Sequence, residues 1–223
     1  MKRLIAISAV FLLFTTFSFA QGGRYFCTEL GSVATFEVSD GNGALLAKYS
    51  EKVASGEGDY TNGAVHYLHS YYDADGKALW KEGPNMKMDI TVTDGECSVR
   101  LESVKKAVKA SEYMCQGNGF YVPADIKAGQ AIKDAKFSVH VGGTIKGTIT
   151  LSGRKVVAKE NVSVPAGSFS AYKVTETQTT KIVGAPTVVK VVTWYVFEKG
   201  VVRQEVYDKN GKLLNTIVLT SFK

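Results

Sequence analysis

The sequence predicts a mainly β protein, built as an antiparallel curved sheet or an incompletely closed β-barrel with about one short helix. Apolar residues recur with a period of two, which is typical of strands that turn one face to a core. Short turn signals separate these runs at hairpin spacing, and one valine-rich run is apolar on both faces. The sequence therefore predicts a signal peptide at residues 1–20 and one antiparallel β domain at residues 21–223.

The composition is that of a folded globular protein. Of 223 residues, 45% are hydrophobic and 22% are charged, which excludes a disordered or low-complexity chain. The formal charge is +6, and removing Lys2 and Arg3 with the signal peptide leaves +6 − 2 = +4. Because this excess is small and basic residues do not interleave with aromatic ones, a nucleic-acid partner is not expected.

The first twenty residues have the three parts of a secretory signal. Lys2 and Arg3 form the charged start, Leu4–Phe14 the apolar run, and Ser18–Ala20 a cleavage site before Gln21. No other stretch of about 20 uncharged apolar residues could span a bilayer. We therefore expect an exported protein that does not cross the membrane.

Two alternating runs and one continuous run predict individual strands. The apolar members of the alternating runs are Met86, Met88, Ile90 and Val92 in the first, and Ile145, Ile149 and Leu151 in the second. The run Thr187–Phe197 is apolar on both faces, so it is expected to be a central strand that is covered on both sides or curved around a core.

Turn signals fall between these runs, and two of them share a longer pattern. The signals are Asp40–Gly43, Asp73–Gly76, Asp94–Gly95, Gly117–Gly119, Gly142–Gly143 and Asp208–Gly211. Tyr72–Leu79 and Tyr207–Leu214 both read Tyr-Asp-x-x-Gly-Lys-x-Leu. Aspartate caps such a turn and glycine supplies the positive φ, whereas a calcium loop would need further oxygen ligands. The similarity indicates either an internal duplication or a common hairpin solution.

One segment departs from the period of two. Within Ser98–Met114, Leu101, Val104 and Val108 fit the apolar stripe of a helix. Val99 and Leu101 could equally prolong a strand.

Three cysteines, Cys27, Cys97 and Cys115, are disulfide candidates in an exported protein, and the sequence does not choose among the three pairings. None has the short spacing to another Cys or His that zinc sites use. Cys27 also lies seven residues into the mature chain, so a lipid-carrying N-terminal cysteine is not expected.

The residues that usually carry catalysis are scattered. His66 and His69 are three apart on a predicted strand and point to opposite faces, and His140 is isolated between valines. Acidic residues are scattered and mostly have a lysine nearby, as Glu51 has Lys52, so no glycosidase-type carboxylate pair can be nominated. We expect no catalytic residues, metal or cofactor.

A family resemblance lies mainly in the second half of the chain. Its residues are Val122, Pro123, Lys127, Gly129, Gln130, Asp134, Arg154, Lys155, Val156, Lys159, Glu160, Val164–Phe169, Tyr172–Val174, Trp194, Tyr195, Gly200–Glu205, Tyr207, Asp208 and Gly211–Leu214. Together they resemble the TapB-like family of exported bacterial proteins, a domain of unknown function. The resemblance implies the periplasm or outer membrane of a Gram-negative bacterium and an open β-barrel distantly similar to periplasmic lipoprotein carriers. It implies no catalytic residues.

Two hypotheses about function follow. The first is a non-enzymatic protein that binds an apolar ligand or a lipid-modified partner on a concave sheet face, with Tyr71, Tyr72 and Trp80 as candidate binding residues. The second is a structural or interaction protein that docks an edge strand or a face onto another envelope component.

Overall fold

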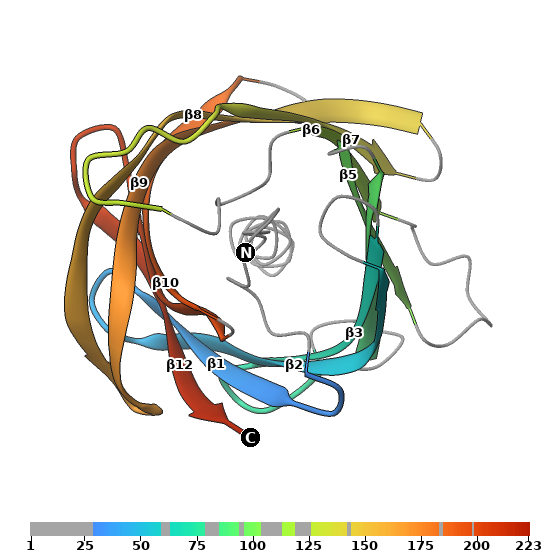
Figure 1. Ribbon diagram of the computed structural model, residues 1–223, viewed down its shortest axis with the longest axis horizontal. Helices are drawn as coiled ribbons and strands as arrows, with labels where there is room; N and C mark the ends of the chain where they lie inside the picture. The colour runs from blue at the N-terminus through green and yellow to red at the C-terminus, as the bar shows by residue number, and fades with distance from the viewer. Residues whose placement is uncertain are drawn as a thin grey trace.

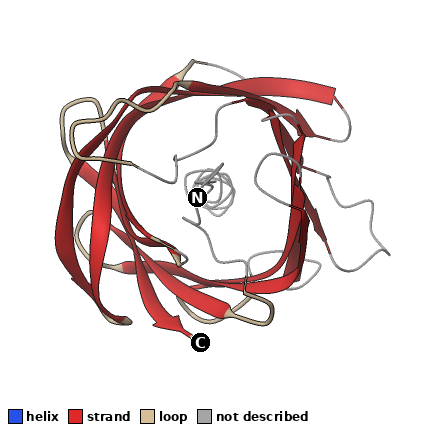
Figure 2. Cartoon of the chain, viewed as in Figure 1, coloured by secondary structure: helices blue, strands red, loops and turns tan. Residues whose placement is uncertain are grey.

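The computed structural model describes residues 29–58, 63–78, 85–93, 96–103, 113–118, 126–141, 144–182, 185–197 and 199–223. These residues form twelve strands, which are drawn in red in Figure 2. The strands are β1 (Val33–Asp40), β2 (Leu45–Gly58), β3 (Gly63–Asp73), β4 (Asn85–Thr93), β5 (Glu96–Ser103), β6 (Tyr113–Asn118), β7 (Ala135–Val141), β8 (Thr144–Val164), β9 (Gly167–Ile182), β10 (Thr187–Val196), β11 (Gly200–Tyr207) and β12 (Leu213–Phe222). The predicted signal peptide, residues 1–20, lies outside the described residues.

Each strand pairs antiparallel with the next one along the chain, and β1 also pairs with β12. The strand order therefore closes into a ring, which Figure 1 shows end-on with β2 and β3 on one side and β8 to β10 on the other. The predicted antiparallel curved sheet is confirmed. The β1–β12 ladder runs from Ala34↔Phe222 to Asp40↔Asn215 and joins the two ends of the sheet. The sheet is therefore more completely closed than the incompletely closed barrel that the sequence predicts.

In most strands the buried side chains alternate with more exposed ones, so the sheet has one face that is mainly buried. In β1, Ala34, Phe36 and Val38 are buried, while the residues between them are only partly covered. These side chains belong to one apolar cluster with Phe137 of β7 and Ile217 of β12. Because that cluster joins strands from different sides of the ring, we take its face as the inner one.

The long hairpin of β8 and β9 contains the main irregularities of register. Its strands have 21 and 16 residues, and β8 shifts register against β9 between Ser152 and Lys155 and again between Val156 and Ala158. Against β7, the register shifts between Val139 and His140. Ile149 and Leu151 are buried as expected, but the prediction for Ile145 is wrong, because it lies beyond this shift and is 62% exposed.

Strand β10 is covered on both faces over part of its length. Thr193, Trp194 and Tyr195 are consecutive and all buried, which confirms the two-sided strand there. The expectation fails toward the ends of the run, since Val188 and Phe197 are exposed.

Three hairpin turns share one hydrogen-bond pattern. Asp73 Oδ1 accepts from the backbone N–H of Asp75 and of Lys77, and Asp208 does the same with Asn210 and Lys212. The β1–β2 turn after Asp40 has the same bonds without the flanking Tyr and Lys. The shared pattern is thus a property of the Asp-x-x-Gly turn, which supports the common hairpin solution.

The predicted helix is wrong where it can be compared. Residues 98–103 belong to β5, and residues 113 and 114 belong to β6. This is the strand alternative that Val99 and Leu101 left open, while residues 104–112 lie outside the described residues. In the described parts of the chain, no helix is long and apolar enough to cross a membrane.

Candidate functional site on the inner face of the barrel

Four aromatic side chains line the inner face of the first strands, and we call them the aromatic wall: Phe36, Tyr49, Tyr67 and Tyr71. All four are buried. The rings of Phe36 and Tyr49 stack with centroids 4.8 Å apart, and the Tyr49 and Tyr71 rings are 5.7 Å apart. They meet because Tyr49 pairs with Phe36 on one side and with Tyr71 on the other, so the three side chains share one face.

A polar cluster, Glu51, His69 and Tyr71, interrupts this wall. Glu51 pairs directly with His69, and Tyr71 follows His69 by two residues, so all three share the inner face. The Tyr71 hydroxyl and Nδ1 of His69 are 2.7 Å apart, which is a hydrogen bond, and the Glu51 carboxylate lies 3.9 Å from the same nitrogen. His69 is 0% exposed, and its Nε2 has no hydrogen-bond partner within the described part of the chain.

Burial removes the charge from this cluster. It raises the pKa of Glu51 from 4.5 to about 8 and lowers the pKa of His69 from 6.5 to about 3. Burial, with the nearby Glu51, also raises the pKa of the Tyr71 hydroxyl well above its ordinary value. Near pH 7 the cluster is therefore predominantly uncharged, and it offers hydrogen bonds without a counter-ion. Glu51 is its more accessible member, with 23% of its side chain exposed.

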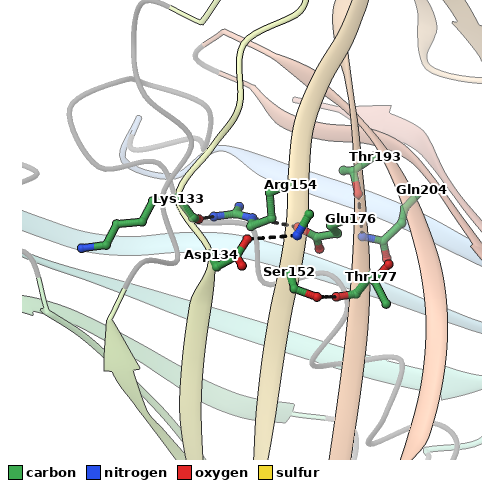
Figure 3. Close-up of polar contacts among 9 residues, drawn as sticks. Lys133, Asp134, Ser152, Arg154, Glu176, Thr177, Thr193 and Gln204 are labelled. Carbon is green, nitrogen blue, oxygen red and sulfur yellow. Dashed lines mark hydrogen bonds and ion pairs between the residues drawn. The ribbon is translucent and has the colours of Figure 1, made fainter.

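A second set of polar side chains, the polar row, lies across β8 to β11: Arg154, Glu176, Thr193 and Gln204. Arg154 Nε donates to Glu176 Oε2 at 2.9 Å, and Gln204 Nε2 donates to Thr193 Oγ1 at 3.0 Å (Figure 3). All four side chains are buried or nearly so. Gln204 pairs with Ile217, a member of the inner cluster, which places this residue on the inner face.

The segment before β7 extends the sheet beside the polar row. Gly129 and Ile132 donate backbone hydrogen bonds to β8, and Arg154 donates to the carbonyl of Lys133 at 3.1 Å. Ile126 and Ile132 form a small apolar cluster with Val156, Val174 and Tyr195. The guanidinium of Arg154 thus ties this segment to β8 and β9 (Figure 3).

The structure separates the binding residues that the sequence nominated. Tyr71 is buried in the aromatic wall, whereas its neighbour Tyr72 points to the opposite face and is half-buried. Trp80 lies outside the described residues, as does Cys27. Cys97 pairs in register with Gly117, and Cys115 pairs with Val99, so these two cysteines sit two register positions apart on neighbouring strands.

Sequence reasoning missed the polar cluster. His66 and His69 do point to opposite faces, and His66 Nδ1 contacts Asp89 at 2.6 Å on the other side of β3. The association of Glu51 with Lys52 was wrong, because Glu51 faces inward and Lys52 is exposed on the opposite face. The available signal was the alternation Tyr67, His69, Tyr71, which places a histidine among inward aromatic residues.

The described residues contain no group of three or more His, Cys, Asp or Glu side chains arranged to hold a metal ion. The aromatic wall offers apolar contact on the inner face, and the polar cluster and the polar row offer hydrogen bonds.

Two solved structures share this fold. One is a protein of Bacteroides fragilis described as a predicted exported protein with a YmcC-like fold, with a TM-score of 0.68, 19% identity and coverage of 90% of this chain and 99% of that one. The other, from Parabacteroides distasonis, is described as a predicted lipoprotein, with a TM-score of 0.64, 20% identity and coverage of 91% and 99%. No curated protein matches the chain. The TapB-like resemblance is not confirmed. A family model matches residues 29–219, and the chain belongs to the DUF3108-like family.

Proposed function

We propose that this protein is an exported, non-enzymatic binding protein of the bacterial envelope that holds an amphiphilic ligand with a long apolar chain against the inner face of its barrel. The observation that carries the proposal is the closed ring of twelve described strands with an apolar inner face. Side chains can fill a barrel of about eight strands, and the diameter grows with strand number. Twelve strands enclose a wider interior, and larger barrels enclose ligand cavities or channels.

The kind of ligand follows from the lining. The aromatic wall and the aliphatic side chains around it favour an apolar chain, because burying apolar surface is the main driving force for such binding. The polar cluster on β2 and β3 and the polar row on β8 to β11 favour a molecule that also carries polar groups. An amphiphile satisfies both requirements, whereas a pure hydrocarbon would leave polar groups facing apolar surface.

Export is supported by the predicted signal at residues 1–20 and by the descriptions of the two structural neighbours as exported protein and lipoprotein. We expect the mature chain to begin at Gln21 without a lipid modification. Intact-mass measurement of the protein recovered from the envelope tests this directly. A mass that includes residues before Gln21, or an added diacylglycerol, would contradict it.

Ligand binding can be tested on the mature protein purified without detergent. We expect native mass spectrometry to show an added mass that extraction with organic solvent removes. The extracted protein should then bind the dye 1-N-phenylnaphthylamine, which fluoresces in apolar surroundings. A detergent-free preparation with neither a removable mass nor dye binding would refute the proposal.

A pair of neighbouring substitutions locates the binding face. Ala47 packs against the inner cluster, and Lys48, the next residue of β2, is exposed on the other face. Ala47→Trp places a large side chain inside the barrel and should weaken dye binding, whereas Lys48→Trp should leave it unchanged. Equal effects of the two variants would contradict binding on the inner face.

The alternative function is docking onto another envelope component. An edge strand is the usual means of such docking, and the pairing of β1 with β12 leaves the sheet without a first or last strand to offer. The exposed side chain of Phe197 favours docking through a face instead. Co-purification of a stoichiometric protein partner that depends on Phe197 would support this alternative.

A further inference from the structure

The buried nitrogen of His69 identifies a polar contact inside the proposed ligand site. His69 is 0% exposed, and none of the residues that the structure describes gives its Nε2 atom a hydrogen-bond partner. A buried polar atom is normally hydrogen-bonded, so one that is not calls for an explanation. The other ring nitrogen is already used, because Nδ1 lies 2.7 Å from the Tyr71 hydroxyl.

The hydrogen bond to Tyr71 fixes what Nε2 can do. A phenol is a better donor than a neutral imidazole, so we assign the Tyr71 hydroxyl as the donor and Nδ1 as the acceptor. In that tautomer the ring proton is on Nε2, which is then an N–H donor that requires an acceptor. Tyr67 flanks the imidazole edge-on, with centroids 5.9 Å apart, and Tyr71 stacks on it at 5.5 Å. These contacts hold the ring in place.

The surroundings select an uncharged acceptor. Burial keeps the pKa of His69 near 3 and that of Glu51 near 8, so at pH 7 the cluster has no cation to pair with a carboxylate or phosphate. A carbonyl oxygen accepts a hydrogen bond without bringing a charge into the apolar interior. The stacked rings of Phe36 and Tyr49 continue from Tyr71 along the same face and offer contact for an acyl chain.

We propose that Nε2–H of His69 donates a hydrogen bond to the carbonyl oxygen of an uncharged acyl ester or amide, whose chain lies along the aromatic wall. This inference rests on the proposed function, since it names the ligand class for the same inner face. Tyr71 acts as a positioning residue, because its hydroxyl holds the imidazole in the tautomer that donates from Nε2. Glu51 lies next to His69, and once Glu51 is deprotonated its negative charge would repel a bound anion.

Two ligands that differ only in the carbonyl test this. Monododecanoylglycerol has an ester carbonyl, and dodecyl glyceryl ether has the same chain and glycerol head without it. We expect the extracted mature protein to bind the ester about tenfold more tightly than the ether, measured by displacement of 1-N-phenylnaphthylamine. Equal affinities would overturn the inference while leaving the proposed function intact. Failure of both ligands and of the dye to bind would refute the proposed function itself.

Substitutions test whether His69 causes the preference for the ester over the ether. His69→Phe should abolish the preference for the ester, measured as the ratio of the ester and ether affinities, and His69→Gln, which keeps an N–H donor, should retain part of that ratio. Tyr71→Phe should reduce it. His66→Phe is the matched control, because His66 lies on the same strand but contacts Asp89 on the other face.

Two further results would overturn the inference. A folded His69→Phe variant that keeps the tenfold preference for the ester would show that another residue donates the hydrogen bond to the carbonyl oxygen. Tighter binding of dodecylamine than of the ester at pH 7 would show that Glu51 binds cations and that the site selects charge. Should His69→Phe not fold, His69→Gln and the comparison of ester with ether in the unchanged protein still decide the question.

Discussion

The indole N–H of Trp194 donates a hydrogen bond to Oε1 of Glu160 at 2.7 Å, and this contact joins β10 to the far part of the β8–β9 hairpin. Trp194 is 5% exposed. Its two cross-strand partners, Lys173 and Arg203, place their cationic groups over its ring, 4.9 and 5.4 Å from the centroid. Lys173 also contacts Glu160 at 3.6 Å. Trp194 is therefore the centre of a small packed network on the face of β10 opposite Thr193 and Tyr195.

Replacing Trp194 by alanine should destabilise the protein by roughly 3 to 5 kcal/mol, because it removes a large buried side chain and leaves a cavity. Trp194→Phe keeps most of the ring but loses the hydrogen bond to Glu160, so its cost should be smaller, roughly 1 to 2 kcal/mol. Urea unfolding of the three proteins measures both values. A loss below about 1 kcal/mol for Trp194→Ala would show that the side chain contributes little to the core.

The two-sided burial around Trp194 could be predicted from the sequence, because residues 191–196 are apolar on both faces apart from Thr193, which is typical of a strand covered on both sides. The position of Ile145 could not be predicted. A register shift between Val139 and His140 depends on how β7 pairs with β8, and the alternation within one strand contains no information about its partner. The closure of the ring depends likewise on pairing between the first and last strands.

Because one strand contains no information about its partner, only part of the site could be predicted from the sequence. That His66 and His69 face opposite sides follows from the geometry of one strand. That His69 meets Glu51 depends on the register of β2 against β3, which includes a shift between Val53 and Ser55. From the sequence, only neighbours along the chain were considered, and Glu51 was therefore associated with Lys52. Lys52, however, points to the opposite face of the sheet.

The ion pair of Arg154 and Glu176 should show strong coupling between the two residues. Arg154→Met leaves the Glu176 carboxylate buried without its cation, and we expect a loss of about 3 to 5 kcal/mol. The double variant Arg154→Met, Glu176→Met removes both charges and should recover most of that loss. A double-mutant cycle from urea unfolding measures the coupling. If the two single losses simply add in the double variant, the pair does not interact as its 2.9 Å contact indicates.

The polar cluster should give the protein a stability maximum at mildly acidic pH. Burial raises the pKa of Glu51 from 4.5 to about 8, so between these values the unfolded chain binds fewer protons than the folded one. Stability from Glu51 therefore falls as pH rises through this window. Burial lowers the pKa of His69 from 6.5 to about 3, so stability from His69 falls as pH decreases from 6.5 to 3. The two effects oppose each other between pH 4.5 and 6.5.

Above pH 6.5 only the Glu51 effect remains, which makes the prediction specific. The thermal unfolding temperature of the unchanged protein should fall as the pH rises from 6.5 to 8. Glu51→Gln should remove this dependence of the unfolding temperature on pH. Glu57→Gln is the control, because Glu57 is an exposed carboxylate on the same strand. A slope that persists in Glu51→Gln, or disappears in Glu57→Gln, would contradict the assignment.

The stability of the Asp-x-x-Gly turns should depend strongly on the glycine and very little on the lysine that follows it. Gly76 and Gly211 have φ values of 78° and 83°, in the left-handed region that a β-branched residue avoids. No atom lies within 4 Å of a Cβ built at either position, so the cost of substitution comes from the backbone itself. Gly76→Val and Gly211→Val should each cost roughly 1 to 3 kcal/mol.

Lys77→Ala and Lys212→Ala are the matched variants at the next position in each turn. Both lysines are exposed, and the contact of Lys77 with Asp75 is 3.9 Å long at the surface, so each change should stay within about 0.5 kcal/mol. The backbone N–H groups of both lysines bond to Asp73 and Asp208 whatever the side chain. Urea unfolding of the four variants compares the two positions. If the lysine variants lost ligand binding while the glycine variants stayed stable, the repeated Tyr-Asp-x-x-Gly-Lys pattern would be a binding motif, since a purely structural turn cannot depend on a solvated side chain that makes no contact with the core.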